Sequence, residues 1–159
     1  MAKKKFVYCD FRPQQIKAEL LARGEQLTRL IIRQLSYIGE KCVKIARELT
    51  PEEGSYDDIS GNLRSSISYT IIVDGKTIQS GKTQPTEGKK GNGAEGERQA
   101  KAMIRKLTAE YTDGIVLVVF AGMHYAVYVE DVRGRDVLAS SKLECERLAR
   151  KLLGKLFEK

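Results

Sequence analysis

The stretch 122-GMHYAVYVED-131 holds the residues of this chain that are best suited to acid–base chemistry. It contains the only histidine of the 159 residues, His124, followed by Tyr125 and further on by Glu130. A histidine near a carboxylate can exchange protons close to neutral pH. A lone histidine at the end of a buried strand is more often structural, however. The stretch could therefore also be a plain buried element or one half of a subunit contact.

The other groups that could do chemistry are weaker candidates. The carboxylates of Glu52, Glu53, Asp57 and Asp58 could bind a metal ion, but a polar loop with helix-capping carboxylates explains them better. The glycines of 88-GKKGNGAEG-96 lack the Lys-Ser/Thr pair that closes a phosphate-binding loop. We therefore expect no enzyme activity, no metal site and no cofactor.

The three cysteines, Cys9, Cys42 and Cys145, are far apart in the sequence. An odd number of cysteines without close spacing argues against a disulfide framework and against a zinc site. Each cysteine is expected to be a small apolar filler.

The chain is basic, with 28 Lys and Arg against 21 Asp and Glu and a formal net charge of +7. A positive surplus favours contact with phosphate backbones or with acidic partner surfaces. The surplus is spread along the chain, because residues 12–49 and 133–159 each carry eight basic and four acidic residues. Charge alone therefore does not establish nucleic-acid binding. No apolar run is long enough to predict a membrane span.

Residues 13–49 predict one long helix, or two helices joined at a bend. Apolar residues recur there at steps of three and four, which is the period of one helix face. Gly24 and Gly39 each weaken such a helix by roughly 1 kcal/mol relative to alanine. The helix is long for a chain of this size, so part of it is expected to pack against something outside its own core.

The remaining elements predict an α+β fold. Asp74-Gly75 lies between two runs rich in β-branched residues, which indicates a hairpin. The apolar run 115–121 predicts a central, buried strand, and apolar spacing predicts helices over 97–111 and 138–157. We expect a long N-terminal helix and a C-terminal helix packed on a small, mainly antiparallel β-sheet, in a single domain over residues 1–159.

A glycine-rich segment at about 80–97 follows the predicted hairpin and has no large aliphatic side chain. Such a composition cannot build a core, so we predict a flexible loop. The lysines Lys82, Lys89 and Lys90 of this loop are candidates for facing DNA or a neighbouring subunit.

Three stretches, taken in order, resemble a known family. They are 58-DISGNLRSSI-67, 122-GMHYAVYVED-131 and the start of the last helix, 137-VLASSKLECERLARKLL-153. They are similar to the tail-component proteins of tailed phages, the head–tail joining or tail-completion proteins of long-tailed phages. The matching residues are Ser60, Gly61, Leu63, Arg64, Ser66 and Ile67 in the first stretch, and Tyr125, Ala126, Tyr128, Val129 and Glu130 in the second.

This resemblance implies a structural role. Such proteins form rings at the neck or the head-proximal end of the tail, and DNA passes through the ring. The chain is then expected to be a homo-oligomer, a hexamer or a dodecamer, that contacts other phage neck or tail proteins and makes non-specific contact with DNA. It is expected in the virion, and in the bacterial host cytoplasm during assembly. The motif residues expected to take part in interactions are Gly61, Leu63, Arg64, Tyr125, Tyr128 and Glu130.

The stretch 122–131 fits either a strand or a helical turn. Gly122 interrupts the preceding apolar run, which favours the helical turn. A helical turn would place Tyr125, Tyr128 and Val129 on one face, and in both readings Tyr125 and Val129 point inward.

We further hypothesise that the stretches 58–67 and 122–131 lie side by side. Arg64 and Glu130 carry opposite charges, and they would then lie near each other or bridge two subunits.

An alternative function is that of a basic nucleic-acid-binding protein without catalytic activity. A single-strand binder interleaves aromatic side chains with Lys and Arg on an exposed sheet. The strand candidates 68–73 and 115–121 carry one aromatic residue each, Tyr69 and Phe120, and few charges. This alternative therefore ranks second.

Overall fold

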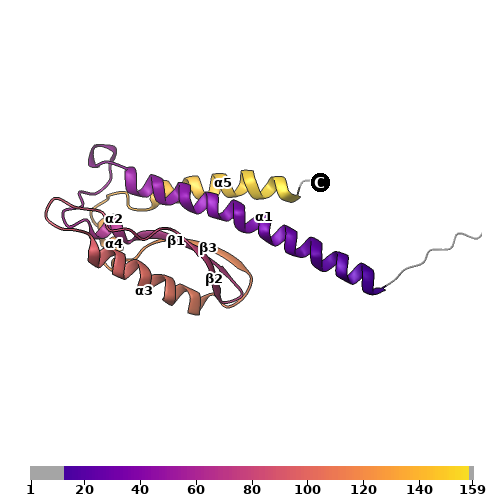
Figure 1. Ribbon diagram of the computed structural model, residues 1–159. Coiled ribbons are helices and arrows are strands. Elements are labelled where there is room, and N and C mark those ends of the chain that lie inside the picture. Colours follow the sequence, from indigo (N-terminus) through magenta and orange to yellow (C-terminus); the bar gives the residue numbers. More distant parts are fainter. Residues whose placement is uncertain (1–12, 158–159) are drawn as a thin grey trace, which may run out of the picture. The chain divides into compact units, whose positions relative to one another are not determined.

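The computed structural model describes residues 13–157 (Figure 1), so that Cys9 lies outside the described residues. The elements follow one another in the order of an α+β fold, as predicted. They are α1 (Pro13–Glu48), the 3-10 turn η1 (Pro51–Glu53), α2 (Asn62–Ser66), β1 (Ile67–Val73), β2 (Lys76–Ser80), α3 (Ala94–Glu110), β3 (Ile115–Ala121), α4 (Ala126–Asp131) and α5 (Ala139–Phe157).

By packing, the chain divides into a first unit that ends at Ile31 and a second, compact unit, Ile32–Lys159. The described part of the first unit, residues 13–31, is the N-terminal half of α1 and consists of one helical segment. A single helix has no interior, so its apolar side chains stay in water, with Leu20 and Leu21 65% and 61% exposed. Helix α1 itself continues unbroken from Pro13 to Glu48, which confirms one helix and not two.

The sheet of the second unit has the strand order β2-β1-β3, and both strand pairs are antiparallel. The Asp74-Gly75 hairpin is confirmed, with both residues at positive φ (47° and 76°). The side chain of Asp74 accepts a hydrogen bond of 2.9 Å from the backbone N–H of Gly114. The tip of the hairpin is thereby attached to the turn that precedes β3.

The prediction that 115–121 is the central strand is wrong, because β1 is central and β3 is an edge strand. Strand β3 is apolar throughout because helices cover both of its faces. Val118 and Phe120 pack with α3, whereas Leu117 and Val119 line a cavity together with residues of α5. The predicted burial is observed only in part, because Phe120 is buried and the other residues of β3 are half-buried. An apolar run therefore indicates that both faces of a strand are covered and does not give its position in the sheet.

Helices cover both faces of the sheet in the second unit (Figure 1). Helix α3 lies on one face, where Ala100 and Leu107 pack with Ile72 of β1 and Phe120 of β3. Residues 32–48 of α1 and helix α5 lie on the other face. The predicted apolar face of the helix at 97–111 is thus confirmed.

Tyr69 of β1 joins the sheet to α1. Its ring lies so close to two glycines that a Cβ atom would be 2.5 Å from the ring at Gly39 and 2.9 Å from it at Gly81. Its hydroxyl donates to Glu40 Oε1 at 3.0 Å and accepts from Gln79 Nε2 at 3.1 Å. Burial, with the Glu40 hydrogen bond, raises the pKa of Tyr69 to about 12, so the hydroxyl keeps the proton that it donates.

Gly39→Ala tests this contact. Alanine has the higher helix propensity, but its methyl group would displace the buried Tyr69 ring, which is overpacking that costs about 1–3 kcal/mol. We expect a lower free energy of unfolding in urea for this variant. The matched control is Gly24→Ala in the same helix, where no atom lies within 4 Å of an added Cβ. Equal effects of the two substitutions on stability would contradict the contact.

Candidate interaction surface

The two stretches that resemble phage tail components lie side by side in the second unit. The backbone N–H of Gly122 donates to the carbonyl of Ser66 at 3.0 Å, and that of Met123 donates to Ser66 Oγ at 3.3 Å. Both stretches also line one cavity of about 200 Å³. Its lining residues are Tyr56, Asp57, Asp58, Ile59, Ser60, Leu63, Tyr125 and Val129. The expected proximity of 58–67 and 122–131 is therefore observed.

The second stretch forms the short helix α4, so the predicted helical turn is confirmed. Tyr125 and Val129 are half-buried and face the cavity, and burial raises the pKa of the Tyr125 hydroxyl. Tyr128 does not share this face: it is 50% exposed, and the guanidinium of Arg133 lies 5.8 Å from the centre of its ring. A step of three residues falls short of a full turn, which brings Tyr128 out to the surface.

His124, the residue best suited to acid–base chemistry, is exposed. Its ring meets the ring of Tyr125 edge-on, with centroids 5.4 Å apart. The Glu130 carboxylate accepts a hydrogen bond of 3.2 Å from the backbone N–H of Leu138. His124 therefore contacts an aromatic ring, and the Glu130 carboxylate binds the backbone just before α5.

Arg64 and Glu130 each have a partner within the chain, and no ion pair joins them in residues 13–157. Arg64 Nη2 donates to the carbonyl of Leu49 at 3.0 Å, and the guanidinium lies 5.5 Å from the centre of the Tyr56 ring. The direct pair within one protomer is absent because both side chains satisfy nearby backbone groups. A bridge between two subunits stays a prediction.

Two other residues of the first stretch support the fold directly. Gly61 precedes α2 at a φ of 76°, and a Cβ there would overlap the carbonyl oxygen of Thr86. Leu63 is 2% exposed. The Asp58 carboxylate accepts the backbone N–H of Arg64 at 2.7 Å and so completes the start of α2. Gly61 and Leu63 are therefore buried and support the residues that form the surface. They are not exposed to a partner.

The glycine-rich segment packs against this first stretch. Lys90 N–H donates to the carbonyl of Ile59 at 2.8 Å, and Gly93 N–H donates to that of Ser60 at 3.2 Å. Thr86 N–H donates to Ser65 Oγ at 2.7 Å. The segment has no regular structure, as expected, but it is anchored, and it ends at Gly93 because α3 begins at Ala94.

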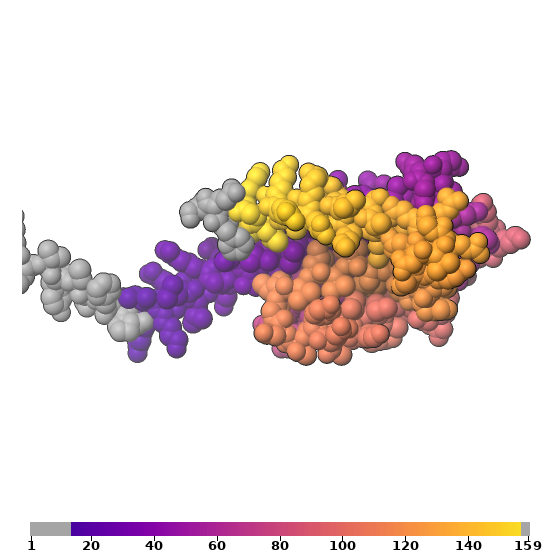
Figure 2. Space-filling view, turned by 180° about the vertical axis from the view of Figure 1, so that it is seen from behind, coloured from indigo at the N-terminus to yellow at the C-terminus, as the bar shows by residue number. Residues whose placement is uncertain are grey.

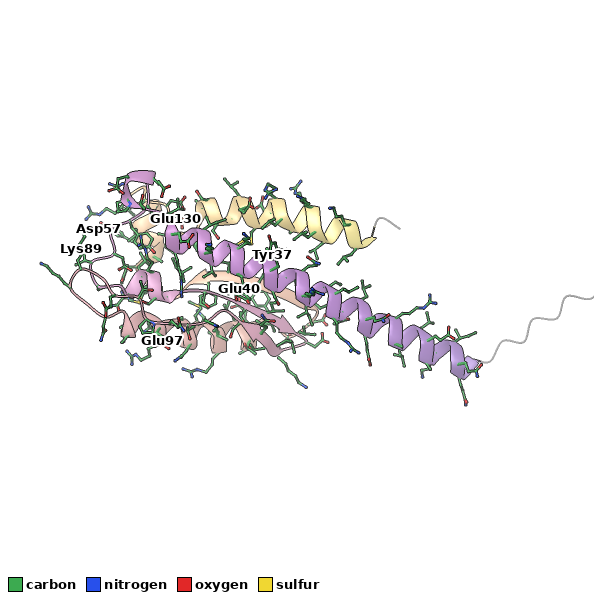
Figure 3. The ribbon with its side chains drawn as sticks, turned by 45° about the horizontal axis from the view of Figure 1, so that its top comes forward. Tyr37, Glu40, Asp57, Lys89, Glu97 and Glu130 are labelled. Carbon is green, nitrogen blue, oxygen red and sulfur yellow. The ribbon has the colours of Figure 1, made fainter. Side chains whose placement is uncertain are left out.

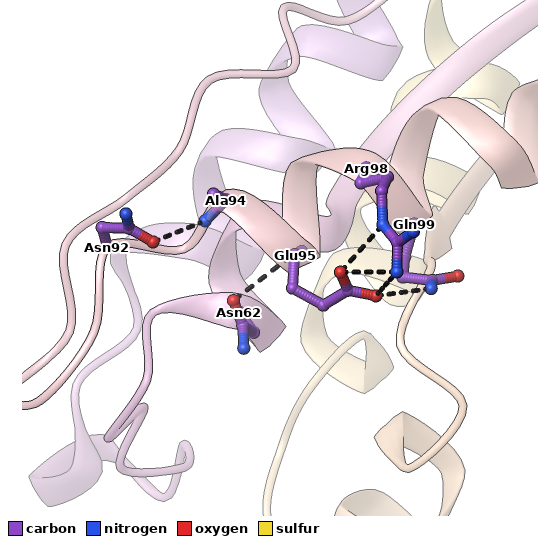
Figure 4. A network of polar contacts seen from close by, with 7 residues as sticks. Asn62, Asn92, Ala94, Glu95, Arg98 and Gln99 are labelled. Carbon is purple, nitrogen blue, oxygen red and sulfur yellow. Dashed lines mark hydrogen bonds and ion pairs between the residues drawn. The ribbon is translucent and has the colours of Figure 1, made fainter.

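The glycines of this segment serve close packing. A Cβ at Gly88 would overlap the backbone of Gly61, and one at Gly96 would overlap that of Asn62. At the start of α3, two side-chain carbonyl oxygens accept hydrogen bonds from backbone N–H groups (Figure 4). Asn62 accepts from Gly96 and Asn92 accepts from Ala94, each at 3.2 Å. Composition suggested flexibility, whereas the positions of these glycines reflect backbone-to-backbone contact.

The lysines of the segment are exposed at positions 82, 89 and 90. Lys89 forms an ion pair of 2.7 Å with Asp57, and the two residues are labelled next to each other in Figure 3. Glu53 has a different partner. Its carboxylate accepts a hydrogen bond of 2.9 Å from the backbone N–H of Thr50, which lowers the pKa of Glu53. Within residues 13–157, no three His, Cys, Asp or Glu side chains are grouped so as to hold a metal ion.

Several exposed apolar side chains lie at or near α4. Val127, Val132 and Tyr128 are 66%, 65% and 50% exposed, and Ile59 across the cavity is 56% exposed. Figure 2 shows the segment that follows β3, in orange, beside α5 in yellow on one face of the second unit. The sequence did not single out Val127, Val132 and Ile59, because only the packing of α4 decides which of its apolar residues stay outside. We call these four residues the α4 patch.

No protein-family model, no curated protein and no solved structure matches this chain. No helix in the described part of the chain is both long enough and apolar enough to span a bilayer.

Gly61→Ala tests the close approach that forms this surface. Gly54→Ala is the matched control, since Gly54 also has a positive φ (93°) but no atom within 4 Å of an added Cβ. Left-handed backbone costs alanine roughly 1–2 kcal/mol at either site. Overlap with Thr86 adds about 1–3 kcal/mol at Gly61 only. Urea unfolding should therefore rank Gly61→Ala as the less stable variant, and the reverse order would contradict the packing.

Proposed function

We propose that this chain is a structural virion protein of a tailed phage or prophage, a neck or tail-completion component. It assembles as an oligomeric ring through which DNA passes. The observation that carries the proposal is the meeting of the two family-like stretches, far apart in sequence, at one surface that also bears the α4 patch. Its role is not catalytic, and it acts in the virion after assembly in the host cytoplasm.

The α4 patch supports a subunit contact. Val127 and Tyr128 lie on α4, Val132 directly follows it, and all three side chains are exposed. Burying apolar surface is worth roughly 25 cal/mol for each Å² removed from water, and contiguous exposed apolar groups commonly mark interaction sites. A neighbouring subunit or another neck or tail protein would cover this patch.

The first unit supplies a second apolar surface of a different kind. Residues 13–31 expose Ile16, Leu20, Leu21, Leu27 and Leu30 on a single helical segment. A ring of identical subunits requires two different, complementary surfaces on each copy, because each copy binds one neighbour on either side. The chain exposes two different apolar surfaces, and their complementarity is part of the proposal.

The charge of the chain fits a lumen that DNA crosses. The net charge is +7, and Lys82 and Lys90 are exposed on the anchored segment beside the Lys89–Asp57 ion pair. Lysines on a lumen wall attract the DNA backbone without reading its sequence.

The same charge supports the alternative, a basic nucleic-acid-binding protein without catalytic activity. Strand binding by stacking needs exposed aromatic rings. Tyr69 and Phe120, the aromatic residues of β1 and β3, are 0% and 7% exposed. Because these aromatic side chains are buried, the sheet offers no stacking platform for nucleic-acid bases. This favours the proposed oligomeric ring over the alternative.

The ring is tested by the solution mass and by negative-stain electron microscopy of the full-length protein. We expect closed rings of six or twelve copies. Val127→Asp/Val132→Asp should reduce them to monomers with an unchanged circular dichroism spectrum, because charges cannot be buried unpaired at the contact. The control is Ile78→Asp, which alters a side chain of β2 that is 51% exposed outside the patch. A wild-type monomer at all concentrations that binds duplex DNA at physiological salt would favour the alternative.

Contact with DNA is tested by replacing Lys82, Lys89 and Lys90 together with alanine. Each phosphate contact that is lost should reduce the slope of log K against log salt by about 0.9. We therefore expect weaker binding of duplex DNA and a slope shallower by roughly 2–3, measured by fluorescence anisotropy. Replacing Lys142, Lys151 and Lys155 of α5 makes the same change in net charge. An equal loss in that control would assign the effect to overall charge.

A further inference from the structure

Cys42 and Cys145 face each other where α1 and α5 pack together in the second unit. Cys42 is 0% exposed, and Cys145 is half-buried. Ser141, one helical turn before Cys145 on α5, donates from Oγ to the carbonyl of Cys42 at 2.9 Å. Cys145, one turn further along α5 than this contact, therefore lies near Cys42. The sequence separation of these cysteines had argued against a pair, and the helix packing brings them together.

Cys145 can be reached from solvent, whereas Cys42 lies behind it. Cys145 lines an open cavity of about 270 Å³ between β3 and α5. The other lining residues are Leu117, Val119, Leu138, Ser141 and Lys142. A small, uncharged reagent can enter an apolar cavity of this size and meet the Cys145 sulfur first.

The two thiols differ in acidity. The hydrogen bond from Cys42 lowers the pKa of Cys145, although burial and the carboxylates of Glu144 and Glu146 oppose this effect. The same contact, together with burial, raises the pKa of Cys42. Because the thiolate is the nucleophile in cysteine chemistry, Cys145 is the attacking sulfur and Cys42 the resolving one.

We infer that Cys42 and Cys145 form a redox-active dithiol, which closes to a disulfide between α1 and α5 when the chain meets a small peroxide. The Cys145 thiolate attacks hydrogen peroxide, the O–O bond breaks, and the released hydroxide leaves as water on protonation. The Cys145 sulfenic acid is then attacked by Cys42, so that the S–S bond forms, the S–O bond breaks and a second water leaves. Two thiols lose two electrons and two protons, and one peroxide becomes two waters.

The disulfide would fasten the C-terminal helix to α1. It would link residues far apart in the chain, and such a link restricts the unfolded state strongly. This inference does not depend on the proposed virion role, because it follows from the packing of two helices of one unit.

The test uses the full-length protein with Cys9→Ser, so that Cys42 and Cys145 are the only thiols. Hydrogen peroxide should remove two hydrogen atoms from the intact mass, and non-reducing peptide mapping should find Cys42 linked to Cys145. The thermal midpoint should rise by roughly 5–10 °C, and dithiothreitol should reverse the rise. Cys145→Ser in the same background should lose the mass change and the rise. Disulfides between two copies, or a Cys145 sulfinic acid without a link, would overturn the inference.

A second measurement tests the hydrogen bond and does not require a disulfide. Cys42→Ala removes the donor, so the pKa of Cys145 should rise and less thiolate should be present at neutral pH. Iodoacetamide should then label Cys145 more slowly at pH 7 and at the original rate at high pH, where the thiol is ionised in both proteins. An unchanged pH profile would contradict the assigned roles. Lys142, on the cavity wall, is present in both proteins and cannot cause the difference.

Discussion

The fit of the Tyr69 ring between Gly39 and Gly81 is the contact on which the second unit depends. It joins the central strand to α1 on one side and to the end of β2 on the other. The ring is fully buried, so its hydroxyl must find partners, and Glu40 and Gln79 supply them. The closeness of helix and strand follows from the absence of a side chain at Gly39. Arg47 then holds the start of β1 through the carbonyl of Ile67, at 2.7 Å from Nη2.

The same physical device shapes the candidate interaction surface. Gly61, Gly88 and Gly96 permit backbones to approach where any side chain would collide. The result is a layered junction of α2, the anchored segment and the start of α3, and Ser66 of α2 binds Gly122 and Met123 of the segment that leads into α4. Three charged side chains around it have partners within the chain: Asp58 binds the start of α2, Lys89 pairs with Asp57, and Glu130 accepts from Leu138. What is left for a partner is mainly apolar, the α4 patch. In the proposed role, a chain with this arrangement would bind its neighbours by burying apolar area. The exposed lysines of the anchored segment would contact the DNA backbone.

The packing of α5 on α1 has a different character. Small side chains lie at this contact, namely Ser141 and the two cysteines, and Ser141 donates to the carbonyl of Cys42. In the reduced state the two cysteines are ordinary core side chains. In the oxidised state they would form a covalent link between α1 and α5. The redox state could then alter how firmly the C-terminal helix is held without altering the fold.

Periodicity and turn chemistry were sufficient to predict the long helix, the Asp74-Gly75 hairpin, α3, β3 and α5, because those signals are local. The resemblance of 58–67 and 122–131 to one family and the opposite charges of Arg64 and Glu130 also suggested that these stretches meet, and α4 was predicted from Gly122. The edge position of β3, the exposure of Tyr128 and the separate partners of Arg64 and Glu130 required the tertiary structure. So did the close-packing role of Gly39 and of the glycines at 88–96, and the proximity of Cys42 to Cys145. A sequence determines which residues can be apolar, small or charged, but proximity between distant residues arises only when helices and strands pack. Exposure, pairing and close approach are therefore decided by the fold.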